Sequence, residues 1–242
     1  KHHFQKRSCL VPSNRAVHVP SISNLKSFIF LTVAKSKISI PQLHPKHYAF
    51  PSPLEASQEG LLAWGGDLEP SRLIEAYRQG IFPWFNEHDP ILWWSPDPRA
   101  ILYPDAMKLS KSLLKSMKHF EIKYDTCFET VMRLCQETRL KENKPSWISE
   151  PLIEAFCALH VKGFAHSVEC YKEGVLVGGL YGLYLDGVFC GESMFSRQEN
   201  ASKTALLVFC AEFIRQGGKL IDCQVLNSHT ASLGAVETPR RE

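Results

Sequence analysis

The feature that most limits the fold of this chain is a set of three apolar segments separated by two turn dipeptides. The segments cover residues 166–171, 175–185 and 188–195, and Glu173-Gly174 and Asp186-Gly187 stand between them. An acid-Gly pair between two β-rich segments is a strong hairpin signal, because the turn needs residues that tolerate a positive φ. The sequence therefore predicts three successive antiparallel strands.

A helix and a further strand follow this meander. Asn200 or Ser202 can cap a mostly apolar helix that extends to about Gln216, where Gly217-Gly218 ends it, and residues 220–225 form a buried strand. Apolar spacing and end signals indicate four more helices, over residues 70–79, 110–119, 128–140 and 150–162. We therefore predict an α+β protein whose larger domain contains one central, mostly antiparallel sheet.

Charge and pattern divide the chain into a tail and two domains. The first 54 residues contain eight Lys or Arg and no acid, whereas the rest carries 20 basic and 25 acidic side chains. Residues 1–44 also lack a sustained period of two or 3.6, so we expect a disordered basic tail with the composition of a targeting peptide. We predict a small α/β domain over residues 45–98 and a larger domain over 99–242, with Asp97-Pro98-Arg99 as the connector.

Composition excludes several classes of protein. A chain of 242 residues with 44% hydrophobic content can bury a sizeable core, so a disordered or fibrous protein is excluded. The longest apolar runs are far shorter than the roughly 20 residues of a membrane helix. The eight cysteines are scattered, without Cys-x-x-Cys, and no His-Glu-x-x-His occurs. We therefore expect reduced thiols, a cytoplasmic protein, and neither a metal nor a cofactor.

Two acids stand in strands that are otherwise apolar. A period of two places Asp222 and Gln224 on one face of their strand, with Cβ atoms roughly 7 Å apart, close enough to share a ligand. By the same rule Glu192 shares a face with Cys190 and Met194. Because an unpaired buried acid is costly, two such acids in one sheet favour a polar pocket in a hydrophobic wall. The alternatives are that Asp222 pairs internally or caps a helix, and that Glu192 faces water.

Three lysines form the clearest basic feature outside the tail. Lys111, Lys115 and Lys118 fall on one face of the helix predicted over residues 110–119. Since the chain after the tail is acidic overall, contact with nucleic acid depends on a local basic patch of this kind. A merely solvated helix face is the alternative. We assign the tryptophans to packing rather than to base stacking: Trp84, Trp93, Trp94 and Trp147.

Eight multi-residue blocks, taken together and in order, carry a family resemblance. They are residues 50–53 (FPSP), 60–63 (GLLA), 65–68 (GGDL), 80–85 (GIFPWF), 90–99 (PILWWSPDPR), 189–196 (FCGESMFS), 200–205 (NASKTA) and 220–227 (LIDCQVLN). Over about residues 49–241 the chain resembles the leucyl/phenylalanyl-tRNA–protein transferases. Long blocks in a fixed order are far more specific than a single short motif.

The resemblance implies a reaction, partners and a fold. Enzymes of this family move leucine or phenylalanine, and weakly methionine, from aminoacyl-tRNA to the α-amine of proteins that begin with Lys or Arg. The product enters N-end-rule degradation. The resemblance also implies a GNAT-like acyltransferase fold for the larger domain, and we expect a monomer with no membrane partner.

Roles for individual residues also follow from the resemblance. Asp222 and Gln224 match the pair that handles the attacking amine, and Glu192 matches a carboxylate that positions the substrates. Asn227 matches a polar contact, and the segment with Lys111, Lys115 and Lys118 corresponds to a basic helix that faces tRNA. The surroundings of the transferred side chain or of the terminal adenosine correspond to Trp147, Met194, Phe195, Ile221 and Cys223.

Other readings remain open on the sequence. The first 44 residues have no family counterpart, and the family continues with a C-terminal segment after the position of Arg241. A CoA-dependent GNAT N-acetyltransferase is the enzymatic alternative, but Asn200 stands where its pyrophosphate loop needs glycine. A truncated, inactive protein that binds tRNA or degrons is the non-enzymatic alternative. The presence of Asp222, Gln224 and Glu192 together favours catalysis.

Overall fold

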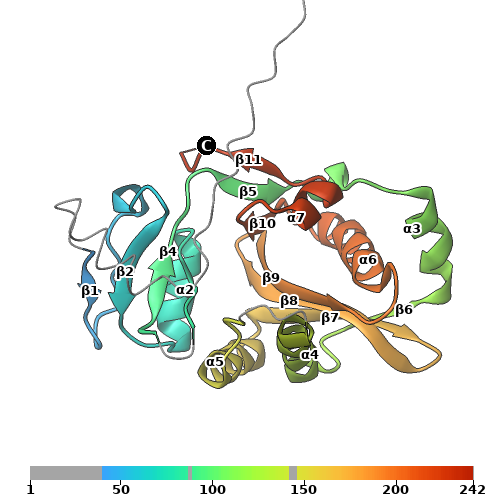
Figure 1. The fold of residues 1–242 in the computed structure, drawn as a ribbon, viewed down its shortest axis with the longest axis horizontal. Helices are drawn as coiled ribbons and strands as arrows, with labels where there is room; N and C mark the ends of the chain where they lie inside the picture. Colours follow the sequence, from blue (N-terminus) through green and yellow to red (C-terminus); the bar gives the residue numbers. More distant parts are fainter. Residues whose placement is uncertain (1–39, 87–88, 142–145, 242) are drawn as a thin grey trace, which may run out of the picture.

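The structure is a computed structural model that describes residues 40–86, 89–141 and 146–241. It contains two β-sheets, a small one with four strands and a large one with seven, which lie side by side along the long axis of the molecule (Figure 1). Most of the predicted tail, residues 1–39, lies outside the described residues.

The small unit consists of a sheet in the order β1-β2-β4-β3 and one helix. Its elements are β1 Gln42–Leu43, β2 Leu61–Gly65, α2 Pro70–Arg78, β3 Phe82–Pro83 and β4 Leu92–Trp94, with a 3-10 turn at Pro53–Glu55. The helix predicted over residues 70–79 is confirmed. Pro70 occupies its first turn, where a missing N–H costs nothing, and Gly80 follows its end at a positive φ of 70°.

This unit begins earlier than the sequence pattern indicated. β1 pairs in parallel with β2, and Leu43 is only 5% exposed. Arg72, which is completely buried, binds the Asp67 carboxylate and also donates hydrogen bonds to three backbone carbonyls, those of His44, Pro45 and His47. The prediction that the tail extends to residue 44 is therefore wrong for residues 40–44, because a buried arginine on α2 holds the chain that follows β1.

The larger unit is built on a sheet in the order β11-β5-β10-β9-β8-β7-β6. β9 and β10 run parallel, and every other neighbouring pair in it is antiparallel. Its strands are β5 Arg99–Leu102, β6 Glu121–Tyr124, β7 Ala165–Lys172, β8 Val175–Leu185, β9 Val188–Ser196, β10 Leu220–Gln224 and β11 Val236–Thr238. Its helices are α3 Lys111–Ser116, α4 Phe128–Lys141, α5 Glu150–Val161, α6 Ala201–Arg215 and α7 Ser228–Leu233, with 3-10 turns at Pro104–Ala106 and Met117–His119.

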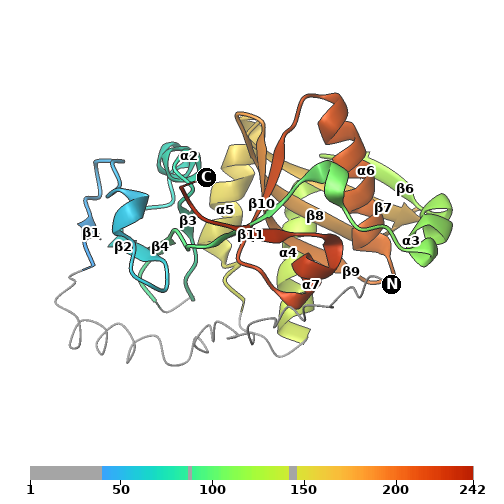
Figure 2. The ribbon, with the colours of Figure 1, turned by 90° about the horizontal axis from the view of Figure 1, so that it is seen from above.

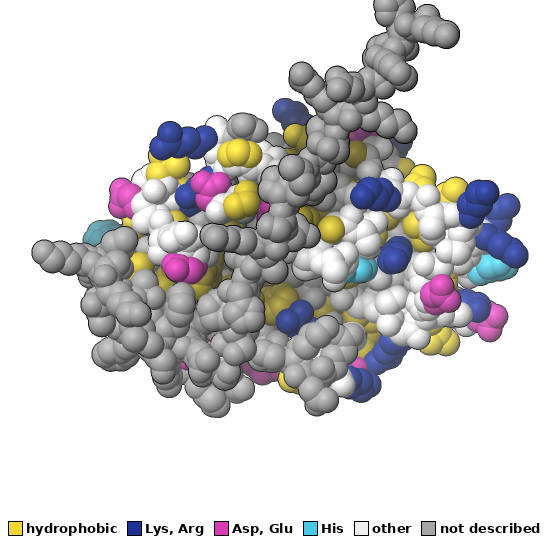
Figure 3. Space-filling model, turned by 45° about the horizontal axis from the view of Figure 1, so that its top comes forward, with side chains coloured by type: hydrophobic (Ala, Val, Ile, Leu, Met, Phe, Trp, Pro, Cys, Tyr) yellow, Lys and Arg dark blue, Asp and Glu magenta, His cyan; other side chains and the backbone are white. Residues whose placement is uncertain are grey.

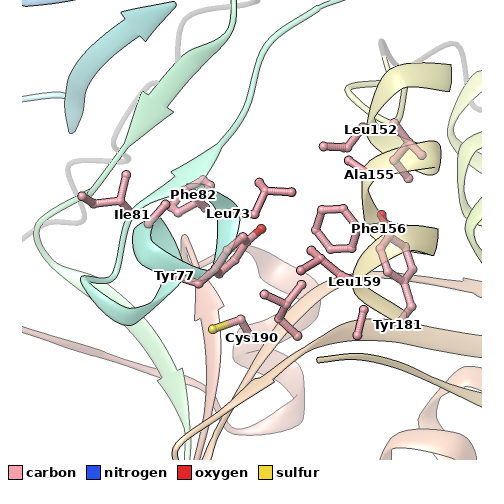
Figure 4. Close-up of a cluster of buried hydrophobic side chains, with 14 of the residues drawn as sticks. Leu73, Tyr77, Ile81, Phe82, Leu152, Ala155, Phe156, Leu159, Tyr181 and Cys190 are labelled. Carbon is pink, nitrogen blue, oxygen red and sulfur yellow. The ribbon is translucent and has the colours of Figure 1, made fainter. Parts of the chain in front are cut away.

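Helices cover both faces of the large sheet. α6 lies on one face, and α4 and α5 lie on the other (Figures 1 and 2). The α6 face contains one hydrophobic core, and the α4–α5 face contains another that continues into the small unit. Leu73 and Tyr77 of α2 lie opposite Phe156 of α5 in this shared core (Figure 4). The two units are thus joined by buried apolar contact.

The predicted α+β class with a mostly antiparallel sheet is confirmed, as are the meander, the helix after it and the strand after that helix. Three strands of the large sheet were not foreseen, namely β5, β6 and β11, all short segments that gain their partners only from distant parts of the chain. Arg99, read as a connector, begins β5. The helix capped by Ser110 ends at Ser116 and continues as a 3-10 turn, and its Leu114 is 43% exposed.

The absence of a side chain at Gly178 sets the position of α6 on the sheet. A Cβ atom at this position of β8 would lie 2.6 Å from the Cβ of Ala201 and 2.9 Å from the backbone nitrogen of Ser202. Both atoms belong to the first turn of α6, so the helix begins in direct contact with the strand backbone.

We therefore expect Gly178→Ala to lower the free energy of unfolding by about 1–3 kcal/mol, because the added methyl group overfills a close helix–strand contact. Urea denaturation measures this loss. Gly191→Ala in β9 is the matched control, since a Cβ there meets nothing closer than 3.8 Å, and it should change stability by less than about 0.5 kcal/mol. Equal effects of the two substitutions would contradict this account of the α6 contact.

Candidate active site

A cavity of about 590 Å³ lies where the two units meet. Phe82, Pro83 and Trp84 of the small unit form one side, and β8, β9, β10, α7 and Trp147 of the larger unit form the others. Much of its wall is apolar and continuous with the core under α6, including Leu102, Leu180, Phe189, Leu206, Ile221 and Leu233. A cavity of this size with a largely apolar lining and few polar groups is typical of a small-molecule site.

Two β-bulges shape the polar part of this wall. The register between β8 and β9 shifts between the pairs Tyr181–Ser193 and Gly182–Gly191, so Glu192 is the extra residue of a bulge. The register between β5 and β10 shifts between Asp222 and Gln224, and Gln224 has a φ of 63°. Bulges redirect side chains, and both of these lie at the cavity.

The redirected side chains of Glu192 and Gln224 contact each other. The Gln224 amide donates from Nε2 to Oε1 of Glu192 at 2.8 Å. The hydroxyl of Tyr77, from α2 of the small unit, donates to the same oxygen at 2.7 Å. Glu192 is 7% exposed and lines the cavity, as does Gln224. The amide oxygen of Gln224 is therefore the atom of that side chain that can accept a hydrogen bond from a ligand.

The acidity of Glu192 is strongly altered by this environment. Burial raises its pKa from the ordinary 4.5 to about 7, and the negative charge of Asp222 acts in the same direction. The hydrogen bond from Tyr77, the charge of Arg99 and the bond from Gln224 oppose the rise. Glu192 can therefore change its charge near neutral pH, which is common among groups at active sites.

Asp222 does not line the cavity; it forms a buried ion pair with Arg99. The Nη2 and Nε atoms of Arg99 lie 2.7 and 2.8 Å from the two carboxylate oxygens, and the two side chains are only 11% and 10% exposed. Burial lowers the pKa of Arg99, but the Asp222 carboxylate outweighs it and keeps that pKa above its ordinary value. Asp222 also accepts the backbone N–H of Gln224 at 2.8 Å. Its contact with Gln224 is thus to the backbone, and the side-chain amide is held by Glu192.

The cavity brings together most of the residues predicted from the sequence. Glu192, Gln224 and five of the six expected binding residues line it: Trp147, Met194, Ile221, Cys223 and Asn227. Phe195 does not, because the bulge at Glu192 reverses the alternation of β9. As a result Cys190 and Phe195 belong to the core on the α4–α5 face, whereas Met194 packs on the α6 face. The expectation that Cys190 and Met194 share a face is wrong for this reason.

Other residues of the site were missed or given another role. Trp84, assigned to packing, lines the cavity with its ring edge-on to Trp147 at 6.2 Å. Arg139 lies over the Trp147 ring at 3.9 Å and also lines the cavity. Tyr77, in the helix predicted over residues 70–79, was given no role in the site, yet its hydroxyl donates to Glu192. Nothing in the local sequence marks Tyr77 or Arg139, because their partners lie on other elements.

Asn227 and His229 begin α7 at the end of β10. The Asn227 side chain accepts the N–H of Thr230 and so caps α7. His229 lines the cavity with Nε2 3.0 Å from the sulfur of Met194. Burial and the charge of Lys203 keep the pKa of His229 below 6.5. The residues after β10 therefore both terminate the strand and form one side of the cavity.

The three predicted tRNA-facing lysines lie away from the cavity. Lys111, Lys115 and Lys118 are all exposed, on α3 and the 3-10 turn after it. α3 is at the end of the larger unit opposite the small unit, and Lys and Arg side chains gather at that edge (Figures 1 and 3). The structure thus shows a basic edge, separate from the cavity.

Comparison with known sequences identifies the family. A profile of the "Leucyl/phenylalanyl-tRNA protein transferase" family matches residues 101–242, and a profile of its N-terminal domain matches residues 66–97. A protein named leucyl/phenylalanyl-tRNA–protein transferase from Citrobacter koseri is 58% identical over 205 residues, covering 83% of this chain and 86% of that protein. A protein of the same name from Salmonella newport is 57% identical over the same shares of the two chains.

The chain belongs to the leucyl/phenylalanyl-tRNA–protein transferase family. The predicted resemblance is therefore confirmed, and with it the enzyme class, an aminoacyltransferase. Among solved structures, the chain is similar to a GCN5-related N-acetyltransferase from Kribbella flavida, with 11% identity, a TM-score of 0.37 and coverage of 67% of this chain and 58% of that one. It is also similar to the C-terminal domain of a putative lysylphosphatidylglycerol synthetase from Agrobacterium fabrum, with 9% identity, a TM-score of 0.42 and coverage of 73% and 65%.

Two further observations concern only the described parts of the chain. In residues 40–86, 89–141 and 146–241 no helix is both long and apolar enough to cross a membrane. The same residues contain no group of three or more His, Cys, Asp or Glu side chains arranged to hold a metal ion.

The buried Arg99–Asp222 pair generates a stability prediction. We expect Asp222→Asn to lower the free energy of unfolding by about 3–5 kcal/mol, because it leaves the guanidinium buried without its counter-charge. Adding Arg99→Met should restore part of the loss in urea denaturation. The surface pair Glu212–Arg215 is the control, and Glu212→Gln should leave the free energy of unfolding nearly unchanged. A double variant that is less stable than Asp222→Asn would contradict the expected coupling.

Proposed function

We propose that the cavity holds the leucyl or phenylalanyl group of an aminoacyl-tRNA and presents its ester to the α-amine of an acceptor protein. The observation that carries this proposal is the Glu192–Gln224 contact in the wall of an otherwise largely apolar cavity. Family membership supports the reaction class, and the geometry supports the assignment of roles to residues.

The apolar wall would select the transferred side chain. Leu180, Leu206 and Ile221 lie among the residues that line the cavity, and none of these side chains has a polar atom to satisfy. Such a surface favours bulky apolar side chains without branching at Cβ. Because one methylene changes binding by only about 1–3 kcal/mol, a low rate with methionine is expected.

Glu192 and Gln224 would hold the two amino groups of the reaction. The Glu192 carboxylate accepts hydrogen bonds from the α-amino group of the aminoacyl ester. The amide oxygen of Gln224 accepts one from the attacking α-amine, because its nitrogen already donates to Glu192. Asp222, which the resemblance assigns with Gln224 to handling the attacking amine, acts through the backbone of residue 224 and through Arg99.

The chemical step is aminolysis of an ester that is already activated. The neutral acceptor amine attacks the ester carbonyl carbon, a C–N bond forms, and the C–O bond to the terminal ribose breaks. The proton lost by the amine reaches the leaving ribose oxygen, through water or the neighbouring ribose hydroxyl, because a neutral amide is too weak a base to keep it. Holding ester and amine together supplies several kcal/mol of the barrier.

The acceptor and the setting are also part of the proposal. After residue 54 the chain carries 25 acidic and 20 basic side chains, and this acidic excess suits an acceptor protein whose first residue is Lys or Arg. On the family resemblance we propose N-end-rule degradation as the fate of the product, a monomeric enzyme and a cytoplasmic location. CoA is disfavoured as the acyl carrier, because Asn200 occupies the turn before α6 and Ser196 already accepts the N–H of Ser202 there.

Transfer of labelled leucine or phenylalanine from charged tRNA to a peptide that begins with Arg tests the proposed function. The wild-type rate should need both a neutral acceptor amine, with a pKa of about 7.7–8.0, and an ionised Glu192. Since the pKa of Glu192 is about 7, the logarithm of kcat/KM should fall with a slope approaching 2 in acid. Glu192→Gln should lower kcat/KM at pH 8 roughly 10- to 100-fold and reduce that slope to 1.

The absence of transfer by the wild-type chain would overturn the proposed function. A Glu192→Gln variant with the wild-type rate and slope would leave the reaction intact but remove Glu192 from it. Competition by CoA, measured in the same assay, distinguishes the acetyltransferase alternative.

The basic edge generates a separate prediction about tRNA. If the lysines of α3 contact phosphates, replacing all three with Ala should weaken tRNA binding and reduce the slope of log K against log salt by about 0.7–0.9 per lost contact. Fluorescence titration over a range of salt concentrations measures both quantities. The control variant carries the same loss of charge away from this edge, with Ala at Lys46, Lys162 and Lys219. If the two triple variants behave alike, the α3 lysines form only a solvated face.

A further inference from the structure

Among the described residues of α2, Tyr77 is the one whose side chain forms a hydrogen bond with Glu192 of the cavity wall. It is 5% exposed, and its ring packs edge-on against Phe156 of α5 at 6.4 Å. Figure 4 shows it extending from α2 toward α5, above Cys190. Its hydroxyl donates to Glu192 Oε1 at 2.7 Å. Tyr77 does not itself line the cavity.

The hydroxyl and the Gln224 amide converge on one oxygen of Glu192. Tyr77 and Gln224 both donate to Oε1, so neither of them uses Oε2. Two donors on one oxygen fix the rotation of the carboxyl group. Burial, with the charge of Glu192, raises the pKa of Tyr77 well above 10, so the phenol remains a donor throughout the working pH range.

These bonds belong to a closed ring that joins the two units. From Glu192 it continues through the side chain of Gln224 to its backbone N–H, then to Asp222 and Arg99. Arg99 donates to the carbonyl of Gly80 at 2.9 Å, and the Gly80 N–H donates to the carbonyl of Tyr77 at 3.1 Å. The ring therefore begins and ends on α2, so the position of this helix and the orientation of Glu192 are linked.

We propose that Tyr77 is a positioning residue of the transferase, through which the small unit orients Glu192 and keeps it ionised for the reaction. This role rests on the proposed function of Glu192. The small unit then contributes to the chemistry of the larger one through a single phenol, in addition to forming part of the cavity wall.

The titration of Glu192 can be followed separately from that of its neighbours. The titratable or charged groups that face it are Tyr77, Tyr181, Cys190, Asp222 and Arg99. Burial raises the pKa of Cys190 and that of Tyr181 well above their ordinary values, so neither changes charge near pH 7. His229, in the same cavity wall, has a pKa below 6.5. A signal near pH 7 that disappears in Glu192→Gln therefore belongs to Glu192.

The test is Tyr77→Phe, which keeps the ring and removes only the hydroxyl. Because the lost hydrogen bond favours the carboxylate, the Glu192 pKa should rise by about 1 unit. The acid limb of kcat/KM should move to higher pH by the same amount, with a roughly 3-fold loss at pH 7.5 that recovers toward pH 9. NMR titration of 13C-labelled Glu side chains measures the same change in the Glu192 pKa and does not depend on transferase activity.

Two further variants make the result decisive. In a Glu192→Gln background, Tyr77→Phe should not move the pH profile. Tyr184→Phe, an exposed tyrosine of β8 outside the cavity, should leave profile and titration unchanged. An unshifted Glu192 titration in Tyr77→Phe, or an equal loss of rate at every pH, overturns the proposal. If the wild type transfers nothing, the proposed function fails, and the NMR titration still decides whether Tyr77 sets the ionisation of Glu192.

Discussion

The geometry of the cavity wall depends on the buried ion pair between Arg99 and Asp222. Both charges are almost fully removed from water, and each is satisfied by more than its partner: Arg99 also binds the Gly80 carbonyl, and Asp222 also accepts the Gln224 N–H. A buried pair is stabilising only when its remaining hydrogen-bonding groups are satisfied in this way. Because these extra partners belong to the turn after α2 and to the bulge of β10, the pair ties the small unit to the polar part of the cavity.

The environment of Glu192 shows that this site is maintained at some cost to stability. A carboxyl group whose pKa is raised from 4.5 to about 7 by folding favours the folded state in its protonated form, and this contribution is lost as the pH rises through 7. Ionised Glu192 is thus a destabilising group, held in place by Tyr77, Gln224 and the charge of Arg99. A destabilising buried charge of this kind is common where a site must bind a polar group inside an apolar cavity.

Local sequence signals predicted the elements whose partners lie nearby in the chain. The Asp186-Gly187 turn and the long runs on either side of it were sufficient for β8 and β9, and Gly80 and Gly217-Gly218 marked the ends of α2 and α6. β1, β5, β6 and β11 were missed because strands of two to four residues have no period of their own. They exist because distant strands offer them hydrogen bonds: β5, for example, pairs with β10 and β11.

For the site, the sequence by itself determined the family, the reaction class and seven of the residues that line the cavity, because the matching blocks are long and carry Glu192, Gln224 and Asn227. Only the tertiary structure decided which way these side chains point. Strict alternation placed Asp222 beside Gln224 and Met194 beside Cys190, but a bulge inserts one residue and reverses every later side chain. Tyr77, Arg99 and Gly80 joined the network for a similar reason: their partners are separated from them by more than a hundred residues or by a unit boundary, and only packing brings them within hydrogen-bonding distance.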